Sequence, residues 1–336
     1  MKKQTFAVSF IFLLSLVACI STKPNGEKFS YQQIIIGSGP AGLTAGIYTA
    51  RANFETLIIE GEMPGGLLTE TPSVENWPGE QSIGGYDLME KMREHAKHVG
   101  STLLFDSVTS VDFSKTPYKI FTREGKTYTA QSVIIATGAA RKKLGCPGEK
   151  EYWGKGVSGC ATCDAPLYRD KTVVVVGGGN SALVEAHHLS RFAKKVTIVH
   201  TSSQFRVNDP IKDKVLSTPN INIIHSCYVD KIEGNGSSVT GIVLRDKETN
   251  RQQTLATDGV FVSVGFEPNT DIFKGQIDLD DRGYIKVSGS TRTSKPGVFT
   301  AGDVSHQRYQ QAIVAAGDGC RAALDSIVYL DLHAGK

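Results

Sequence analysis

The sequence has few cysteines, little net charge and, after about residue 30, no apolar run long enough to cross a membrane. Six cysteines in 336 residues cannot form a disulfide scaffold, so any cysteine chemistry must be local. Lysine and arginine number 37 against 34 for aspartate and glutamate, and a formal charge of +3 is too balanced for a nucleic-acid-binding surface. Nucleic acid is therefore not an expected partner.

Glycine, by contrast, is abundant. Its 35 residues are about a tenth of the chain, where roughly 7% is usual, and they follow no collagen period. Such an excess indicates many tight turns between strands and helices. Hydrophobic residues at 40% and charged residues at 21% exclude wholesale disorder. The length allows two domains with a core each, so we expect a glycine-rich α/β enzyme.

A strand, a glycine turn, a helix and a second strand follow one another from Tyr31. The turn has the GxGxxG pattern, the helix is predicted over 43–52, and the second strand, 56–59, ends on Glu60. Glycines let the backbone approach a pyrophosphate, the helix N-terminus attracts its charge, and Glu60 can bind a ribose hydroxyl. The alternative is an ordinary glycine turn. The predicted phosphate turn consists of Gly37, Ser38, Gly39, Pro40, Ala41 and Gly42.

The same unit recurs 140 residues later. A strand over 172–176 precedes a second glycine turn, a helix predicted over 183–192 and a strand over 195–199. Gly37 to Glu60 is 23 positions, and so is Gly177 to His200. Two dinucleotide folds in one chain serve to bring two different dinucleotides together. The second predicted turn consists of Gly177, Gly178, Gly179, Asn180, Ser181 and Ala182.

Glycine and proline mark the joints between these units, near 145–148 and 265–269. The tail from about 269 is too short for its own core, so we expect it to return to the first unit. The predicted fold class is α/β with two Rossmann-like dinucleotide-binding domains, the second inserted into the first. The first domain comprises 30–145 and 269–333, the second 146–268, and residues 1–22 form a separate signal-like segment.

Cys160 and Cys163 form a CxxC pair just before the second unit. Two cysteines at this spacing can close a small disulfide ring, and the adjacent Asp164 could move the proton that thiol–disulfide exchange requires. The alternatives are half a zinc site or two buried free thiols. No second CxxC exists, and the adjacent His187 and His188 face apart on a helix, so redox chemistry is favoured over zinc. Three isolated cysteines are expected to be small core residues: Cys146, Cys227 and Cys320.

Together these residues resemble the low-molecular-weight thioredoxin reductases of the pyridine nucleotide-disulfide oxidoreductase group. The resemblance covers roughly residues 31–333. The residues that carry it are the turn 37–42, Val74-Glu-Asn-Trp-Pro-Gly79, Ala136-Thr-Gly138, Cys160-Ala-Thr-Cys163-Asp164, the turn 177–182 and Gly302-Asp303.

The resemblance implies that the first fold binds FAD and the second a nicotinamide nucleotide. It implies that Cys163 faces the flavin, that Cys160 attacks the disulfide of a thioredoxin-like protein and that Asp164 is the acid–base residue. It also implies a homodimer and two alternating domain orientations. The further FAD-binding residues it implies are Glu60, Thr69, Asn76, Ala136, Thr137, Gly138, Gly302, Asp303, Gln311 and Ala312.

Three positions depart from the pattern of the family. Leu67 stands where glutamine is common, and Pro166-Leu167 replaces an aromatic pair, which bears on the identity of the protein partner. His200 is followed by Thr201 and Ser202 in place of paired arginines. Because no acid follows before Asp209, we expect NADPH to be preferred over NADH, with Arg206 as the main phosphate contact and with a smaller preference than arginine-paired relatives have.

The first residues are typical of a secretory signal. Lys2 and Lys3 precede an apolar run over 6–18, and small residues precede Cys19, as in bacterial lipoprotein signals whose cysteine is lipidated. We expect membrane association through Cys19. The alternatives are an uncleaved anchor, since 4–22 is uncharged, and an unprocessed extension on a cytoplasmic protein, where reduced nicotinamide is supplied.

The sequence therefore predicts an FAD-dependent disulfide reductase in which electrons pass from NADPH, or NADH, through FAD and the Cys160–Cys163 pair to a thioredoxin-like protein. Two alternatives stay open at this point. One is a membrane-tethered flavoprotein that senses redox state or acts as a scaffold without nicotinamide turnover, and the other is a reductase supplied by another electron donor.

Overall fold

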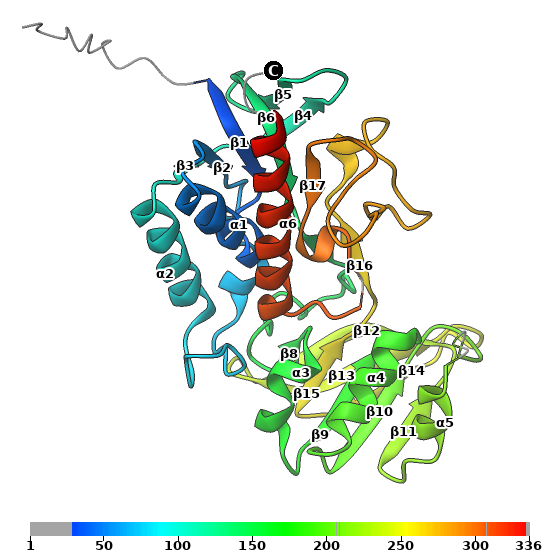
Figure 1. The fold of residues 1–336 in the computed structure, drawn as a ribbon. Coiled ribbons are helices and arrows are strands. Elements are labelled where there is room, and N and C mark those ends of the chain that lie inside the picture. Colours follow the sequence, from blue (N-terminus) through cyan, green and yellow to red (C-terminus); the bar gives the residue numbers. More distant parts are fainter. Residues whose placement is uncertain (1–28, 206, 208, 307, 334–336) are drawn as a thin grey trace, which may run out of the picture.

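The computed structural model describes residues 29–205, 207, 209–306 and 308–333. The signal-like segment 1–22, including Cys19, therefore lies outside the described residues. Within those residues no helix is both long enough and apolar enough to cross a membrane. The described chain forms two α/β units, one above the other in Figure 1.

The first unit is built on a seven-stranded sheet. Its core is parallel, in the order β3-β2-β1-β6. The crossover helices α1 and α2 connect β1 to β2 and β2 to β3, and the antiparallel strands β4 and β5 precede β6 in the chain. The last strand, β17, pairs with the C-terminal half of β6, so the tail of the chain returns to the first unit. The strands are β1 (Ser30–Ile36), β2 (Thr56–Ile59), β3 (Thr102–Leu104), β4 (Val108–Asp112), β5 (Tyr118–Thr122), β6 (Thr127–Ile135) and β17 (Val298–Thr300).

Three helices pack on one face of this sheet (Figure 1). They are α1 (Pro40–Arg51), α2 (Gly85–His98) and α6 (Ala312–His333). The other face is covered by the antiparallel β4–β5 hairpin and by the segment of the short helix η3 (Asp271–Phe273). Buried on both faces, β1 reads as a continuous apolar run over 34–36 rather than as an alternating strand.

The second unit has a parallel sheet in the order β11-β10-β9-β15-β8. A three-stranded antiparallel sheet, β12-β13-β14, packs on one face of it, and α4 and α5 pack on the other. The strands are β8 (Val157–Ser158), β9 (Thr172–Val176), β10 (Lys195–Val199), β11 (Ile221–Ile224), β12 (Cys227–Gly234), β13 (Val239–Asp246), β14 (Gln252–Ala256) and β15 (Gly259–Val262). The helices are α3 (Ala161–Asp164), η2 (Ala165–Tyr168), α4 (Asn180–Leu189) and α5 (Ile211–Leu216).

Two short strands connect the units. β7 (Ala139–Arg141) and β16 (Phe266–Pro268) pair antiparallel, so the outgoing and returning chains cross side by side. Gly145, Gly148 and Gly265, which flank them, have φ of 72°, 89° and 98°, a region that favours glycine. Together with the parallel cores of the two larger sheets, this confirms the predicted fold class of two Rossmann-like domains, the second inserted into the first.

Candidate active site

The first glycine turn has the close packing that a phosphate-binding turn needs. At Gly37, with φ of 107°, a Cβ would lie 2.3 Å from the Ala136 carbonyl oxygen, and at Gly42 a Cβ would lie 1.9 Å from the Gly37 oxygen. No side chain caps the start of α1, and a Cβ on Gly39 would meet no atom within 4 Å. The turn therefore leaves free amide groups facing open space, as an anion site requires.

The second turn repeats this arrangement. Gly177 has φ of 146°, and a Cβ there would lie 2.2 Å from the Ser263 carbonyl oxygen. No side chain caps α4 at Gly179 either. Both helices begin three residues earlier than predicted, at Pro40 and Asn180, because Gly39 and Gly179 within the turns are themselves the N-caps. In α1, proline is also well suited to the first helical position.

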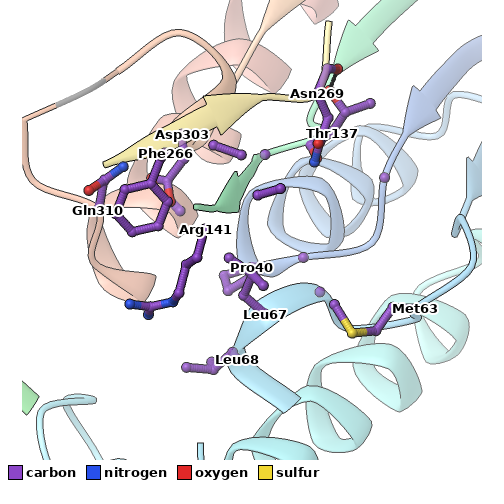
Figure 2. A pocket seen from close by; sticks show the side chains of 18 of the residues that line it. Pro40, Met63, Leu67, Leu68, Thr137, Arg141, Phe266, Asn269, Asp303 and Gln310 are labelled. Carbon is purple, nitrogen blue, oxygen red and sulfur yellow. Dashed lines mark hydrogen bonds between the residues drawn. The ribbon is translucent and has the colours of Figure 1, made fainter. Parts of the chain in front are cut away.

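A cavity of about 1060 Å³ is lined both by the first turn and by the redox pair. Figure 2 shows part of it, with Pro40 of the turn, Arg141 and Asp303 among its lining residues. The cavity gathers predicted residues from segments far apart in the sequence. Gly42 and Thr69 do not line it: Gly42 packs behind the turn, and the Thr69 hydroxyl donates to the Gly66 oxygen at 2.8 Å. The predicted residues that line the cavity are Gly37, Ser38, Gly39, Pro40, Ala41, Glu60, Asn76, Ala136, Thr137, Gly138, Cys160, Cys163, Asp164, Gly302, Asp303, Gln311 and Ala312.

Glu60 closes β2 at one end of this cavity, and Arg93 of α2 holds it in place. Arg93 Nε donates to Glu60 Oε1 at 2.7 Å and Arg93 Nη2 donates to Oε2 at 3.1 Å, while the Glu60 side chain is only 2% exposed. The hydrogen bond to Glu60 raises the pKa of Arg93. Sequence reasoning missed Arg93, because nothing in the helical pattern of α2 distinguishes it from its charged neighbours.

Polar residues from two distant segments, around Asn76 and over 303–311, also line the cavity. Asn76 Nδ2 donates to Gln311 Oε1 at 3.2 Å across 235 positions of sequence. Asp303 lies at the start of η4 (Gly302–Val304), where burial raises its pKa to about 6. Leu67 and Leu68 also face the cavity (Figure 2). The cavity wall is therefore apolar at Leu67, where glutamine is common in the family.

Cys160 and Cys163 form a disulfide with a Cα–Cα distance of 5.3 Å. Cys160 is the N-cap of α3, and its sulfur accepts a hydrogen bond from the Cys163 amide at 3.2 Å. Both cysteines are half-buried. Burial raises the pKa of the neighbouring Asp164, although a hydrogen bond from Ser158 opposes this effect. A carboxyl group that keeps its proton nearer neutrality beside a disulfide can act as a general acid.

The other cysteines are less uniform than predicted. Cys227 is buried in the core of the second unit, whereas Cys146 and Cys320 are half-buried. Burial raises the pKa of Cys146 to about 11, which makes its thiol unreactive at neutral pH.

Arg141 connects the crossing strands to the redox loop and was also missed. It donates a hydrogen bond to the carbonyl oxygen of Gly159, next to Cys160, and its guanidinium carbon lies 5.2 Å from the centroid of the Phe266 ring. Figure 2 shows the two side chains next to each other. Burial lowers the pKa of Arg141, and several carboxyl groups, including Glu185 and Asp303, offset part of that effect.

The second turn does not line the large cavity. His200 ends β10 under this turn, where it is buried, stacks on Phe205 at 4.5 Å and has its pKa lowered by burial. Thr201 and Ser202 line a separate pocket of about 610 Å³, while Arg206 lies outside the described residues. The structure thus separates the second predicted nucleotide site from the redox pair.

Comparison with known proteins identifies the family to which these features correspond. Residues 31–319 match the family described as pyridine nucleotide-disulphide oxidoreductase. The chain is 47% identical to the thioredoxin reductase of Rickettsia prowazekii (90% of this chain, 99% of the relative) and 48% identical to that of Streptomyces clavuligerus (88% and 93%). It is also 45% identical to a Pseudomonas fluorescens protein named glucosaminate ammonia-lyase (89% and 95%).

Solved structures give the same result. Thioredoxin reductase from Giardia duodenalis matches with a TM-score of 0.86 at 42% identity, over 91% of this chain and 100% of that one. The Lactococcus lactis enzyme in its FR conformation is 36% identical over 90% and 99%, yet its TM-score is 0.62. The coverage of the two structures is thus nearly equal, while the second superposes less well on this chain.

Proposed function

The chain belongs to the pyridine nucleotide-disulphide oxidoreductase family, and within it we propose that this protein acts as a low-molecular-weight thioredoxin reductase, an FAD-dependent enzyme with NADPH as electron donor. The observation that carries the proposal is the Cys160–Cys163 disulfide in one cavity with the first dinucleotide turn. A reducible disulfide beside a flavin site has a use in disulfide reduction and none in the elimination of ammonia.

The residues of the large cavity fit FAD. The uncapped N-terminus of α1 faces open space at Gly39, where a pyrophosphate would bind, and Glu60 is held ready for a ribose hydroxyl. Asn76, Gln311 and Asp303 would lie along the flavin side. When bound, FAD supplies hydride acceptance from NADPH and two-electron transfer to the disulfide.

The chain's own residues complete the exchange. Two electrons and two protons convert the Cys160–Cys163 disulfide into two thiols. We assign Cys163 to the flavin side and Cys160 to attack on the disulfide of the protein substrate, after which Cys163 displaces the substrate's second thiol and the internal disulfide re-forms. Asp164, whose pKa burial raises, donates the proton to the departing thiolate.

Turnover needs the second nucleotide site to approach the flavin, and the two crossings between the domains would allow it. We assign 30–145 and 269–333 to the FAD domain and 146–268 to the NADPH domain, with 1–22 as the signal-like segment. The left-handed glycines beside β7 and β16, and the weaker superposition on the Lactococcus lactis FR conformation, support a rotation about these strands. The free N-terminus of α4 supports nucleotide binding and not a nucleotide-free scaffold.

The cysteine pair tests the proposal. Anaerobic NADPH should bleach the flavin absorbance of the purified FAD-loaded protein and produce two new thiols per chain, the two halves of one disulfide. Cys160→Ser and Cys163→Ser should keep flavin reduction and lose reduction of thioredoxin, and Cys320→Ser is the matched control that should lose neither. Full thioredoxin reduction by either of the first two variants would remove the pair from the mechanism.

A homodimer is part of the proposal, with α6 at its centre. Leu324, Val328 and Leu332 repeat every four residues along α6 and are 50%, 55% and 69% exposed, and Tyr48 of the adjacent α1 is 42% exposed. Figure 1 shows α1 and α6 next to each other. An exposed apolar stripe on this helix pair suits a self-complementary interface.

We further propose membrane association through a lipidated Cys19, on the strength of the basic, apolar and small-residue pattern of the signal-like segment. Fractionation of cells that produce wild type or Cys19→Ala tests this. Membrane-bound wild type and soluble variant would support the anchor, whereas soluble protein in both cases would exclude it.

A further inference from the structure

Paired arginines are missing after His200, yet the pocket at this place contains a cation from elsewhere in the chain. The pocket of about 610 Å³ lies beyond the end of β10. Its described lining residues include one cation, Lys247, and one anion, Glu248, both from the β13–β14 turn. The rest are residues 201–205 and Ser226. We propose, on the premise of the reductase function above, that Lys247 binds the 2′-phosphate of NADPH.

The backbone fixes Lys247 against the loop after β10. Its amide donates to the Ser226 oxygen at 2.8 Å, and the Ser226 amide donates to the Ser202 oxygen at 3.2 Å. Ser226 has φ of 52°, so the chain turns sharply here to bring β12 and the turn after β13 beside the loop. The three segments therefore form one hydrogen-bonded wall.

The turn that carries Lys247 is itself tightly organised. Asp246 Oδ1 accepts hydrogen bonds from the Glu248 and Thr249 amides at 3.0 and 2.7 Å and from the Thr249 hydroxyl at 2.9 Å. These bonds fix the first residues of the turn without using the Lys247 side chain. The position of its Cα is thus set before any ligand binds, which lowers the entropy cost of using it as a phosphate contact.

The ammonium group of Lys247 lies against the loop after β10, the loop expected to contact the 2′-phosphate. Lys247 Nζ donates to the Thr201 carbonyl oxygen at 3.1 Å, and the residue is otherwise exposed. An ammonium carries three N–H donors, so a phosphate at this loop can accept from the same nitrogen. Thr201 and Ser203 are exposed beside it and add hydroxyl donors.

The position relative to the nucleotide follows from the fold. In a dinucleotide-binding unit the residue that recognises the ribose of the adenosine stands at the end of the second strand, which is His200 here. His200 is buried under the glycine turn and packs on Phe205, so it forms the floor and not the phosphate contact. A phosphate on the 2′-oxygen would extend past His200 to Thr201, where Lys247 lies.

Glu248 makes the inference specific. A carboxylate in the same pocket repels a 2′-phosphate and could instead accept hydrogen bonds from the two ribose hydroxyls of NADH. The pocket thus holds Lys247, which suits NADPH, and Glu248, which suits NADH. Substitution of Lys247 should weaken binding of the 2′-phosphate, and substitution of Glu248 should strengthen it. A single lysine opposed by a glutamate also gives a physical reason for a modest preference.

Binding of adenosine 2′,5′-diphosphate and of 5′-ADP to the oxidised, FAD-loaded protein tests these two expectations by calorimetry, without turnover. We expect wild type to prefer the 2′-phosphorylated probe, Lys247→Gln to lose about tenfold or more of its affinity for that probe alone, and Glu248→Gln to gain two- to threefold. Lys231→Gln, an exposed lysine on β12, is the matched control. Wild-type preference that Lys247→Gln leaves unchanged would overturn the inference, and so would a loss of 5′-ADP binding in Glu248→Gln alone. Failure of wild type to bind either probe would instead contradict the reductase proposal.

Discussion

The Arg93–Glu60 pair allows a sharp prediction about the stability of the FAD domain. Truncation by Arg93→Ala leaves the Glu60 carboxylate, 2% exposed, without its two guanidinium hydrogen bonds. Removing one partner of a buried ion pair costs about 3–5 kcal/mol, and because Arg93 itself is 19% exposed we expect about 3 kcal/mol. The same change should weaken FAD binding, since Glu60 would no longer be held toward the ribose.

The chain offers a matched control on the rim of the same cavity. Arg123 pairs with Glu62, but their side chains are 61% and 66% exposed, so Arg123→Ala should cost less than about 1 kcal/mol. Urea unfolding of the FAD-free proteins measures both effects, and retention of FAD on ultrafiltration measures the loss of binding. Arg93→Lys should fall between wild type and alanine, and adding Glu60→Gln to Arg93→Ala should recover part of the loss because no buried charge is left. Equal costs for Arg93→Ala and Arg123→Ala would refute the reasoning.

Three further predictions concern single positions. Burial raises the pKa of Glu185 to about 7, so the folded protein binds a proton that the unfolded chain releases near its usual pKa, and the free energy of unfolding falls as pH rises from about 4.5 to 7. Glu185→Gln should flatten this fall and stabilise the protein at pH 8 by about 1–3 kcal/mol in urea titrations. An unchanged pH profile in the variant would contradict the raised pKa of Glu185. Asp164→Asn should slow thioredoxin reduction by at least about a hundredfold with unchanged thiol yield per NADPH. The variant should also lose the decline in rate that wild type shows as pH rises through the raised pKa of Asp164. A wild-type pH–rate profile in the variant would exclude Asp164 as the general acid. Val328→Asp should convert the dimer to monomers in sedimentation experiments, whereas Leu216→Asp, equally exposed on α5, should not, and dimers in both variants would place the interface elsewhere.

The features that sequence predicted well are local ones. The strands 56–59, 172–176 and 195–199 match the structure residue for residue, because short β-branched runs between glycine turns have few alternatives. The predicted helix starts lie three residues too late, because the sequence pattern assigns 40–42 and 180–182 to the glycine turns, whereas these residues already form the first turn of each helix. Only the family resemblance predicts that Asn76 and Gln311 belong to one site, because no local sequence pattern connects residues 235 positions apart.

The residues that sequence missed share a physical cause. Arg93, Arg141 and Lys247 are ordinary cations in sequence, and each acquires its role from a partner on another element: Glu60, the Gly159 carbonyl and the loop at Thr201. A charged side chain loses little hydration free energy at the surface and much in the protein interior, so the role of a cation depends on where the fold places it. Only the tertiary fold distinguishes these three from the other lysines and arginines among the 37 in the chain.

Arg141 shows what this placement implies for the whole molecule. It stands on β7, one of the two strands that link the domains, and donates to Gly159 immediately before the redox pair while lying over Phe266 of the other linking strand. Both crossings and the redox loop therefore meet at one guanidinium. A rotation that twists β7 against β16 must either carry the Gly159 loop along or break its hydrogen bond to Arg141, which would leave a half-buried cation short of an acceptor. In the proposed mechanism, the position of Cys160 and Cys163 would thereby be coupled to the angle between the domains.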